Sequence, residues 1–292
     1  MRIKKAVIPA AGMGTRFLPI SRSIPKELIP IIDRPTIHYI VEEAVASGIE
    51  DILIIISEEK QSITNYFRGL SEQELKLSER KDMKGLKSLG MITEKSNIYY
   101  TKQEEPLGLG DAIRYAKDFV GDEPFAVLLG DDVIYSDKPC IKQLMEVYDR
   151  FGTSILGVRK VDKENIIKYG NLKGQLKEDK IYIVDALVEK PVDNEIYSNI
   201  AVLGRYIITP GIFEILDNIE PGKDEEIQLT DGLNLLAQKE TVYAYEFEGR
   251  RYDIGNKMGF LEANIEYALR DEGFSQDFIK YILKIAEKHN KI

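Results

Sequence analysis

A turn of small residues near the N-terminus has the composition of an anion-binding loop. The apolar residues 6–9 lead into Ala10, Ala11, Gly12, Met13, Gly14 and Thr15, and Arg16 follows. Small side chains let backbone N–H groups approach phosphate oxygens or a flat base edge, and a guanidinium binds phosphate through a fork of donors. The turn has no GxxxxGK[ST] motif, and Phe17 stands where a dinucleotide fingerprint needs its third glycine. A tight strand-to-helix turn without a ligand is the alternative.

Paired carboxylates follow a second apolar segment. Asp131 and Asp132 follow residues 125–129 after a single glycine, where ligands of α/β proteins collect. Adjacent residues at a strand end point in opposing directions, so only one of the two is expected to face a metal. A role for Asp132 in a turn or cap is the alternative. Hard carboxylate oxygens suit Mg²⁺, which usually binds through one or two carboxylates together with substrate phosphates.

The composition excludes several kinds of protein. The 292 residues carry 40 basic and 49 acidic side chains, and a net charge of −9 disfavours binding to duplex DNA or anionic lipid. Two histidines in unrelated segments make a Ser-His-Asp triad or a multi-histidine metal site improbable, and one cysteine excludes an internal disulfide. No apolar run is long enough to cross a bilayer and the N-terminus does not resemble a signal peptide, so we expect a cytoplasmic protein.

The elements that must position these residues follow an α/β pattern in the first 160 residues. The two longest apolar runs do not alternate with polar residues, which is typical of strands covered on both faces. Strands are expected at 6–9, 51–57, 98–102, 125–129 and 154–158, and helices at 36–46, 61–67, 110–119 and 140–150.

Two other regions differ from this pattern. Residues 69–97 are highly charged with leucines at helical spacing, which predicts one or two amphipathic helices, either a solvated excursion or a lid or subunit contact. Beyond residue 180 the expected strands are 182–189, 201–209 and 241–247, and the expected helices are 210–218, 257–270 and 275–289. This half predicts a mixed sheet that completes a site opened by the first half.

A long composite pattern resembles the sugar-nucleotide pyrophosphorylases, nucleotidyltransferases that act on sugar 1-phosphates. It runs G-x-G-T-R-F-x-P, then Pro25-Lys26-Glu27, then Asp33-Arg34-Pro35. Later blocks look like the bacterial UTP–glucose-1-phosphate uridylyltransferases and fall in family order to about residue 260. These blocks begin at Gln103, Val127, Val188, Gly204, Glu226 and Arg251. Among the departures from the family pattern, Asp111 stands where a histidine is common.

The resemblance assigns roles to individual residues. Arg16 and Lys26 are the expected catalytic clamp for the triphosphate, and Asp131 and Asp253 the expected ligands of Mg²⁺. Gln103 offers an amide donor and acceptor that match the imide edge of uracil. The residues expected to bind the nucleotide are Ala10, Ala11, Gly12, Gly14, Thr15, Glu27, Gln103 and Gly108. The residues expected to bind the sugar phosphate are Asp132, Gly170, Glu189 and Lys190.

The resemblance implies an α/β fold, a three-layer α/β/α sandwich with a mixed, mostly parallel central sheet of the Rossmann-like nucleotidyltransferase type. We expect one domain, with a nucleotide-binding half at about 1–160, a sugar-binding half at about 161–255 and C-terminal helices at about 256–292. The implied reaction is Mg²⁺-dependent in-line transfer from UTP to glucose 1-phosphate, giving UDP-glucose and pyrophosphate, by a homodimer or tetramer. The alternatives are a sister enzyme for dTTP or another sugar, and a non-catalytic nucleotide-sugar-binding subunit.

Overall fold

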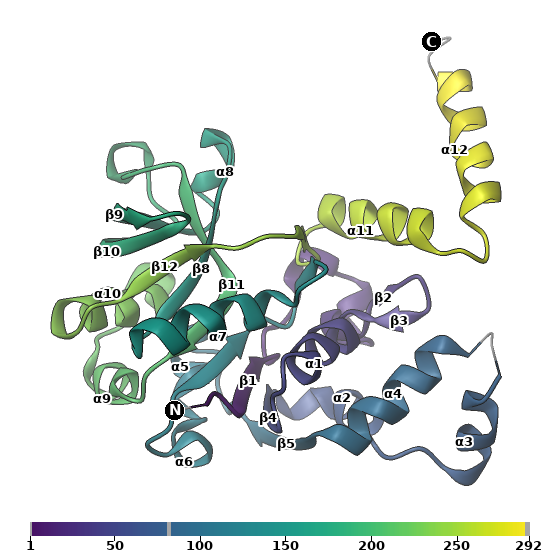
Figure 1. The fold of residues 1–292 in the computed structure, drawn as a ribbon, viewed down its shortest axis with the longest axis horizontal. Coiled ribbons are helices and arrows are strands. Elements are labelled where there is room, and N and C mark those ends of the chain that lie inside the picture. The colour runs from purple at the N-terminus through teal and green to yellow at the C-terminus, as the bar shows by residue number, and fades with distance from the viewer. Residues whose placement is uncertain (1, 81–82, 290–292) are drawn as a thin grey trace.

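A nine-stranded sheet forms the centre of the molecule. The computed structural model describes residues 2–80 and 83–289, and its sheet has the strand order β5-β4-β1-β6-β11-β8-β12-β10-β9 (Figure 1). In that order the strands are β5 (Asn97–Lys102), β4 (Asp51–Ile56), β1 (Lys5–Pro9), β6 (Phe125–Leu128), β11 (Ile200–Ile208), β8 (Ile155–Lys160), β12 (Tyr243–Glu246), β10 (Ile181–Glu189) and β9 (Gly170–Glu178).

The sheet is mixed, as predicted. β5, β4, β1 and β6 pair in parallel, and β8 pairs in parallel with β12. β11 runs antiparallel to both β6 and β8, and β10 runs antiparallel to β12 and β9. Because β6 is bonded to β11, strands from both expected halves belong to one sheet.

Helices cover both faces of the sheet, which confirms the three-layer sandwich. Alternate residues of β1 and β4 enter two separate apolar clusters, with Ile8 and Ile54 in one and Val7 and Leu53 in the other. Such unbroken apolar strands gain about 1.5–3 kcal/mol for each large aliphatic side chain that both layers bury. One face carries α1 (Thr36–Ala46), α2 (Gln61–Tyr66), α4 (Lys84–Lys95) and α7 (Cys140–Phe151), and the other carries α5 (Leu109–Arg114), α9 (Gly211–Asn218) and α10 (Leu229–Lys239).

The structure differs from the sequence expectations in several elements. The helix expected at 110–119 is two short helices, α5 and α6 (Lys117–Val120), because Tyr115 N–H bonds to the carbonyl of Ala112 and tightens the turn between them. The sequence analysis missed α8 (Lys163–Ile166), α10, β9 and two small ladders. The ladders pair β7 (Asp132–Tyr135) with β13 (Arg250–Asp253), and β2 (Pro30–Ile31) with β3 (Arg34–Pro35). The missed strands are short or polar and have no apolar pattern of their own. They become recognisable only from the strands with which they pair.

The charged segment 69–97 forms α3 (Glu72–Ser78) and α4, as predicted. Ser71 caps α3 in a capping box with Glu74, and α3 has no buried residue. α4 instead packs on α1, where Ser88 contacts the buried ring of His38 at 3.0 Å. The excursion is therefore anchored through α4 and solvated along α3.

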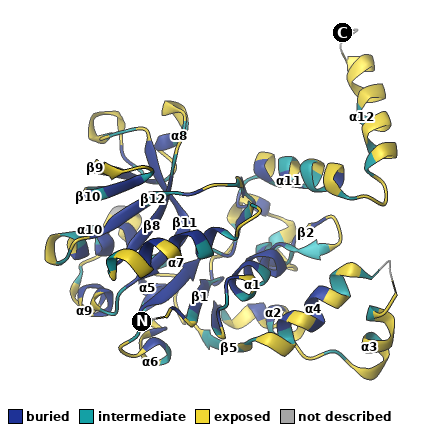
Figure 2. Ribbon diagram, in the orientation of Figure 1, coloured by how far each residue is buried: buried dark blue, intermediate teal, exposed yellow. Residues whose placement is uncertain are grey.

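The C-terminal helices leave the body of the molecule. α11 (Lys257–Arg270) packs against β13 and β2, whereas α12 (Ser275–His289) extends away and has no buried residue (Figures 1 and 2). Within residues 2–80 and 83–289, no helix is both long enough and apolar enough to span a membrane.

Candidate active site

A cleft of about 1120 Å³ opens beyond the carboxyl ends of β1 and β6. Its lining combines the N-terminal turn, the loop after β6, the end of β10 and the segment that follows β13. Ten of the predicted site residues lie on its wall: Gly14, Thr15, Arg16, Lys26, Asp131, Asp132, Gly170, Glu189, Lys190 and Asp253. Groups separated by more than 200 residues therefore meet on one surface.

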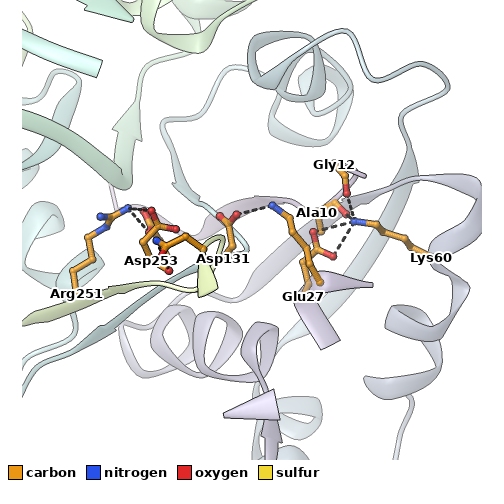
Figure 3. A network of polar contacts seen from close by, with 10 residues as sticks. Ala10, Gly12, Glu27, Lys60, Asp131, Arg251 and Asp253 are labelled. Carbon is orange, nitrogen blue, oxygen red and sulfur yellow. Dashed lines mark hydrogen bonds and ion pairs between the residues drawn. The ribbon is translucent and has the colours of Figure 1, made fainter. Parts of the chain in front are cut away.

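The N-terminal turn is held from behind by a buried lysine that the sequence analysis missed. Lys60 donates to the carbonyl oxygens of Ala10 and Gly12 at 2.6 and 2.7 Å and pairs with Glu27 at 2.8 Å (Figure 3). Burial raises the pKa of Glu27 and lowers the pKa of Lys60. By binding these carbonyl oxygens, Lys60 keeps them from facing an anion in the cleft.

This arrangement places Glu27 away from the cleft wall. Glu27 is 1% exposed, and its carboxylate accepts from Lys60 and does not face the cleft. The structure also leaves Ala10, Ala11 and Gly12 outside the lining of the cleft. Gly14 has φ +66°, and a Cβ there would lie 3.2 Å from Cβ of Lys26, so glycine lets the turn pack closely on Lys26.

Lys26 and Asp131 form the central ion pair of the cleft. The Lys26 ammonium donates to Asp131 Oδ2 at 2.5 Å. Burial opposes ionisation of both groups, but each partner stabilises the charge of the other, so the pKa of Lys26 lies above its usual value and the pKa of Asp131 below it. Both side chains are therefore charged at neutral pH.

Asp131 and Asp253 flank a single point beside Gly255. A Cβ on Gly255 would lie 2.9 Å from Asp131 Oδ2, 3.0 Å from Asp253 Oδ1 and 3.6 Å from Arg16 Nη1. Ile254 N–H also donates to the carbonyl of Asp131 at 2.8 Å, which ties the two segments together. Glycine keeps this point free of a side chain, so two carboxylates and a guanidinium converge on it.

Asp132 has a different partner from Asp131, although both line the cleft. It lies 2.5 Å from Arg251 and is 3% exposed, and burial raises the pKa of Asp132 to about 6. A Cβ on Gly204 would overlap this carboxylate, so glycine makes room for it. Arg251 therefore already neutralises this carboxylate, and the predicted contact of Asp132 with a sugar phosphate stays a prediction.

A second buried ion pair supports the loop of Asp131 and Asp132. Arg205 contacts Glu43 at 2.7 Å and also donates to the carbonyl oxygens of Asp132 and Gly204. Glu43 in turn accepts from Ile141 N–H at 2.9 Å. The pair joins α1, β11, α7 and the carboxyl end of β6 behind the cleft.

Replacing Arg205 by methionine is expected to lower the free energy of unfolding by about 3–5 kcal/mol, because it leaves Glu43 buried without a counter-charge. Urea denaturation followed by circular dichroism measures the change. Lys138→Met is the control, since it breaks the exposed Lys138–Glu146 pair, and no measurable change is expected there. Equal stability of the two variants would contradict the role given to Arg205.

The far end of the cleft carries the residues expected at the sugar. Thr230 donates to Glu189 at 2.6 Å, and a Cβ on Gly170 would lie 3.1 Å from Thr230 Oγ1. Lys190 has φ +43°, an uncommon conformation for a residue with a side chain, and its N–H bonds to the carbonyl of Tyr169. Local strain thus accompanies the side chain predicted to bind the sugar phosphate.

Gln103 and Gly108 lie outside the lining of the cleft. The Gln103 amide donates to Asp111 at 2.7 Å and to the carbonyl of Gly108 at 3.3 Å. Gly108 has φ +107°, and a Cβ there would lie 2.7 Å from the carbonyl of Ile227. The structure therefore gives Gly108 a second reason to be glycine, the close packing of this loop on the segment before α10.

Two carboxylates of the cleft are suited to bind a divalent cation whose remaining ligands would come mainly from the substrate. Within the described part of the chain there is no cluster of three or more His, Cys, Asp or Glu side chains that could hold a metal alone. Asp131 and Asp253 offer two hard oxygen ligands at one point, which matches the way Mg²⁺ binds through carboxylates and phosphates together.

Comparison with known proteins identifies close relatives. The nucleotidyl transferase family model matches residues 5–270. A UTP–glucose-1-phosphate uridylyltransferase of Staphylococcus epidermidis is 48% identical over 97% of this chain and 99% of its own. A solved UDP-glucose pyrophosphorylase in complex with UDP-glucose superposes with a TM-score of 0.87 at 42% identity, over 92% of this chain and 100% of its own. A UTP-bound UGPase from Acinetobacter baumannii gives a TM-score of 0.84 at 37% identity, over 96% and 99% of the two chains.

Proposed function

This chain belongs to the nucleotidyl transferase family, in the group of UTP–glucose-1-phosphate uridylyltransferases, and from that premise we propose how its cleft makes UDP-glucose. The phosphate oxygen of glucose 1-phosphate attacks the α-phosphorus of UTP in line, and pyrophosphate leaves. The convergence of Arg16, Lys26, Asp131 and Asp253 at one end of the cleft carries this proposal. The predicted family, fold and activity agree with the relatives described above.

The first obstacle to this reaction is repulsion between anions. A phosphate monoester, with a second pKa near 6, is largely dianionic at neutral pH and needs no general base to attack. Catalysis then depends on positioning and charge neutralisation. Lys26 and Arg16 supply two cationic side chains at the same end of the cleft, and Lys190 supplies a third farther along.

Lys26 must change partners when UTP binds. In the free protein its ammonium is bonded to Asp131 at 2.5 Å. Triphosphate oxygens carry more negative charge than one carboxylate, so we propose that Lys26 turns from Asp131 to the α-phosphate and bridges it to the incoming sugar phosphate. Release of Lys26 also frees Asp131 for a cation.

A divalent cation, most simply Mg²⁺, completes the proposed site. Asp131 and Asp253 would hold it together with substrate phosphates. Such an ion neutralises phosphate charge and makes the phosphorus more electrophilic. The buried Asp132 is already paired with Arg251, so we leave it out of this set.

The two ends of the substrate would meet different surfaces. We propose that the side-chain oxygen of Gln103 accepts from the imide N–H of uracil, because the amide nitrogen already donates to Asp111 and to the carbonyl of Gly108. At the other end, Glu189 is positioned by Thr230 to accept from sugar hydroxyls. Lys190 would then bind the phosphate of the sugar.

We also propose a homo-oligomer that works in the cytoplasm. The exposed helix α12 carries apolar side chains that are 36–60% exposed, at Ile279, Tyr281, Leu283 and Ile285. A second copy of the chain would shield them from water. The lone cysteine, Cys140, is buried and unpaired, as in proteins of a reducing compartment.

A panel of substrates tests the proposed function. Pyrophosphate release with UTP and glucose 1-phosphate is expected to exceed release with ATP or CTP by about tenfold or more, since those bases lack the imide edge of uracil. Release with dTTP is also expected to be lower, because dTTP has the same imide edge but adds a methyl group to the base and lacks the 2′-hydroxyl. Galactose 1-phosphate and mannose 1-phosphate test the sugar. A tenfold preference for dTTP would favour the sister enzyme, and UDP-glucose binding without turnover would favour a non-catalytic subunit.

A further inference from the structure

Arg251 lies in the cleft between two aspartates and bonds to a tyrosine. One of its terminal nitrogens, Nη2, is 2.5 Å from Asp132 Oδ1 and 3.9 Å from Asp253 Oδ2. The other, Nη1, donates to the hydroxyl of Tyr169 at 3.1 Å, and the guanidinium lies 4.7 Å from the centre of the Tyr169 ring. We propose that Arg251 is a positioning residue that orients Asp253 for the metal, through Tyr169, while Asp132 holds Arg251 in place. The inference rests on the proposed function, because it takes Asp253 as a metal ligand.

The direction of the hydrogen bonds follows from the chemistry of the donors. A guanidinium has no acceptor, so Arg251 donates to the oxygen of Tyr169. The Tyr169 hydroxyl then has its own proton left for Asp253 Oδ2, which lies 3.2 Å away. A carboxylate only accepts hydrogen bonds, so Arg251 and Asp253 favour the same orientation of the hydroxyl. Arg251 therefore holds the Tyr169 hydroxyl where its proton meets Asp253.

The two oxygens of Asp253 are thereby given different tasks. Oδ2 accepts from Tyr169 and faces Arg251. Oδ1 is the oxygen next to Gly255, on the side where Asp131 Oδ2 also lies. Hydrogen bonds of this kind to the far oxygen of a ligating carboxylate orient it and tune its affinity for a cation.

Asp132 supplies the counter-charge that lets Arg251 stay in this place. In the ladder of β7 and β13, Asp132 is the register partner of Asp253, so the two carboxylates leave neighbouring strands side by side. Arg251 contacts both from the same strand as Asp253. This gives Asp132 a task that explains why a second acidic residue follows Asp131: it anchors the arginine and does not contact the cation.

Direct Mn²⁺ binding tests the inference without relying on turnover. Mn²⁺ is titrated into full-length protein saturated with UDP-glucose, free Mn²⁺ is measured by electron paramagnetic resonance, and UDP-glucose alone is the blank. Arg251→Met and Tyr169→Phe are expected to weaken Mn²⁺ binding about 10–100-fold, the range seen when outer-shell partners of metal ligands are lost. Calorimetry should show that both bind metal-free UDP-glucose with nearly wild-type affinity. Saturating Mn²⁺ should restore most of kcat in both variants, because each variant disturbs the orientation of Asp253 but keeps Asp253 itself as a metal ligand.

Arg250→Met is the matched control. Arg250 is the neighbouring arginine on β13 and also borders the cleft, but it pairs with Glu262 and Glu266 of α11. Its replacement should leave the affinity for Mn²⁺ unchanged. An equal loss of Mn²⁺ affinity in Arg250→Met and Arg251→Met would show that the effect comes only from removing a positive charge, and it would overturn the inference.

Two further variants keep the test decisive. Arg251→Lys keeps the charge, but a single ammonium cannot reproduce the fork that joins Asp132 and Tyr169, so wild-type affinity for Mn²⁺ in this variant would also overturn the inference. If Arg251→Met does not fold because Asp132 is left buried and unpaired, Tyr169→Phe decides, since it removes one hydroxyl and no charge. Wild-type protein that makes no UDP-glucose would overturn the proposed function, whereas active wild type with unaffected Tyr169→Phe would overturn only this inference.

Discussion

Replacing Lys26 by methionine is expected to lower kcat for UDP-glucose formation about 10³-fold, the loss typical of a preorganised charge that stabilises a transition state. Lys26 is the cation placed directly against Asp131, at the end of the cleft where Arg16 also lies. Methionine keeps most of the length of the side chain but leaves the phosphates and Asp131 to repel each other. Steady-state rates of pyrophosphate release with saturating UTP, glucose 1-phosphate and Mg²⁺ measure the effect.

The stability of this variant separates a chemical loss from a structural one. Lys26 is 22% exposed at the cleft, so its replacement should move the melting temperature far less than Arg205→Met does. Lys4→Met is the control for a change of net charge, because Lys4 pairs only at the surface with Glu50. Near-normal turnover in Lys26→Met would refute the clamp.

Asp131→Asn is expected to cause a loss of similar size, about 10³-fold in kcat, because a neutral amide neither ligates a cation as strongly nor holds Lys26. The substitution preserves the size of the side chain and the hydrogen bond from Ile254 to the backbone of Asp131. Excess EDTA should lower the activity of the wild-type enzyme at least as much as Asp131→Asn does. Adding back Mg²⁺ should restore the activity of the wild type but not that of the variant.

A carboxylate far from the cleft provides the comparison for this experiment. Asp149 is exposed on α7, and Asp149→Asn should behave as wild type with and without EDTA. Full activity of the wild type in EDTA would rule out the cation in the proposed mechanism. Full activity of Asp131→Asn with Mg²⁺ would rule out Asp131 as its ligand.

The sequence was sufficient for elements whose residues are buried by both layers or that repeat at helical spacing. The helices α1, α11 and α12 have the predicted bounds, and β1 and β4 differ from them by one residue. In these segments the hydrophobic pattern itself specifies the structure. A continuous apolar strand is stable only between two layers, and apolar residues at helical spacing form one face of a helix. The motif pattern also sufficed for the family, and hence for the mixed three-layer fold.

The supporting contacts of the site could not be read in the same way. Lys60 follows a strand like many solvated lysines, and only folding brings it to Glu27 and the carbonyl oxygens of Ala10 and Gly12. The partners of Arg251 lie 119 and 82 residues away, and the β7–β13 ladder sets one of them opposite Asp253. No local pattern encodes such a pair.

From its sequence alone this chain could be assigned the charges that its chemistry needs, because residue types and motif spacing identify phosphate-binding cations and metal-binding carboxylates. Only the tertiary structure decided which of two adjacent aspartates pairs with Lys26 and which anchors an arginine. It also showed Glu27, predicted to bind the nucleotide, paired with Lys60 behind the turn. The physical reason is that a side chain's function depends on its partners, and those partners come from strands and loops that only the packed sheet brings together.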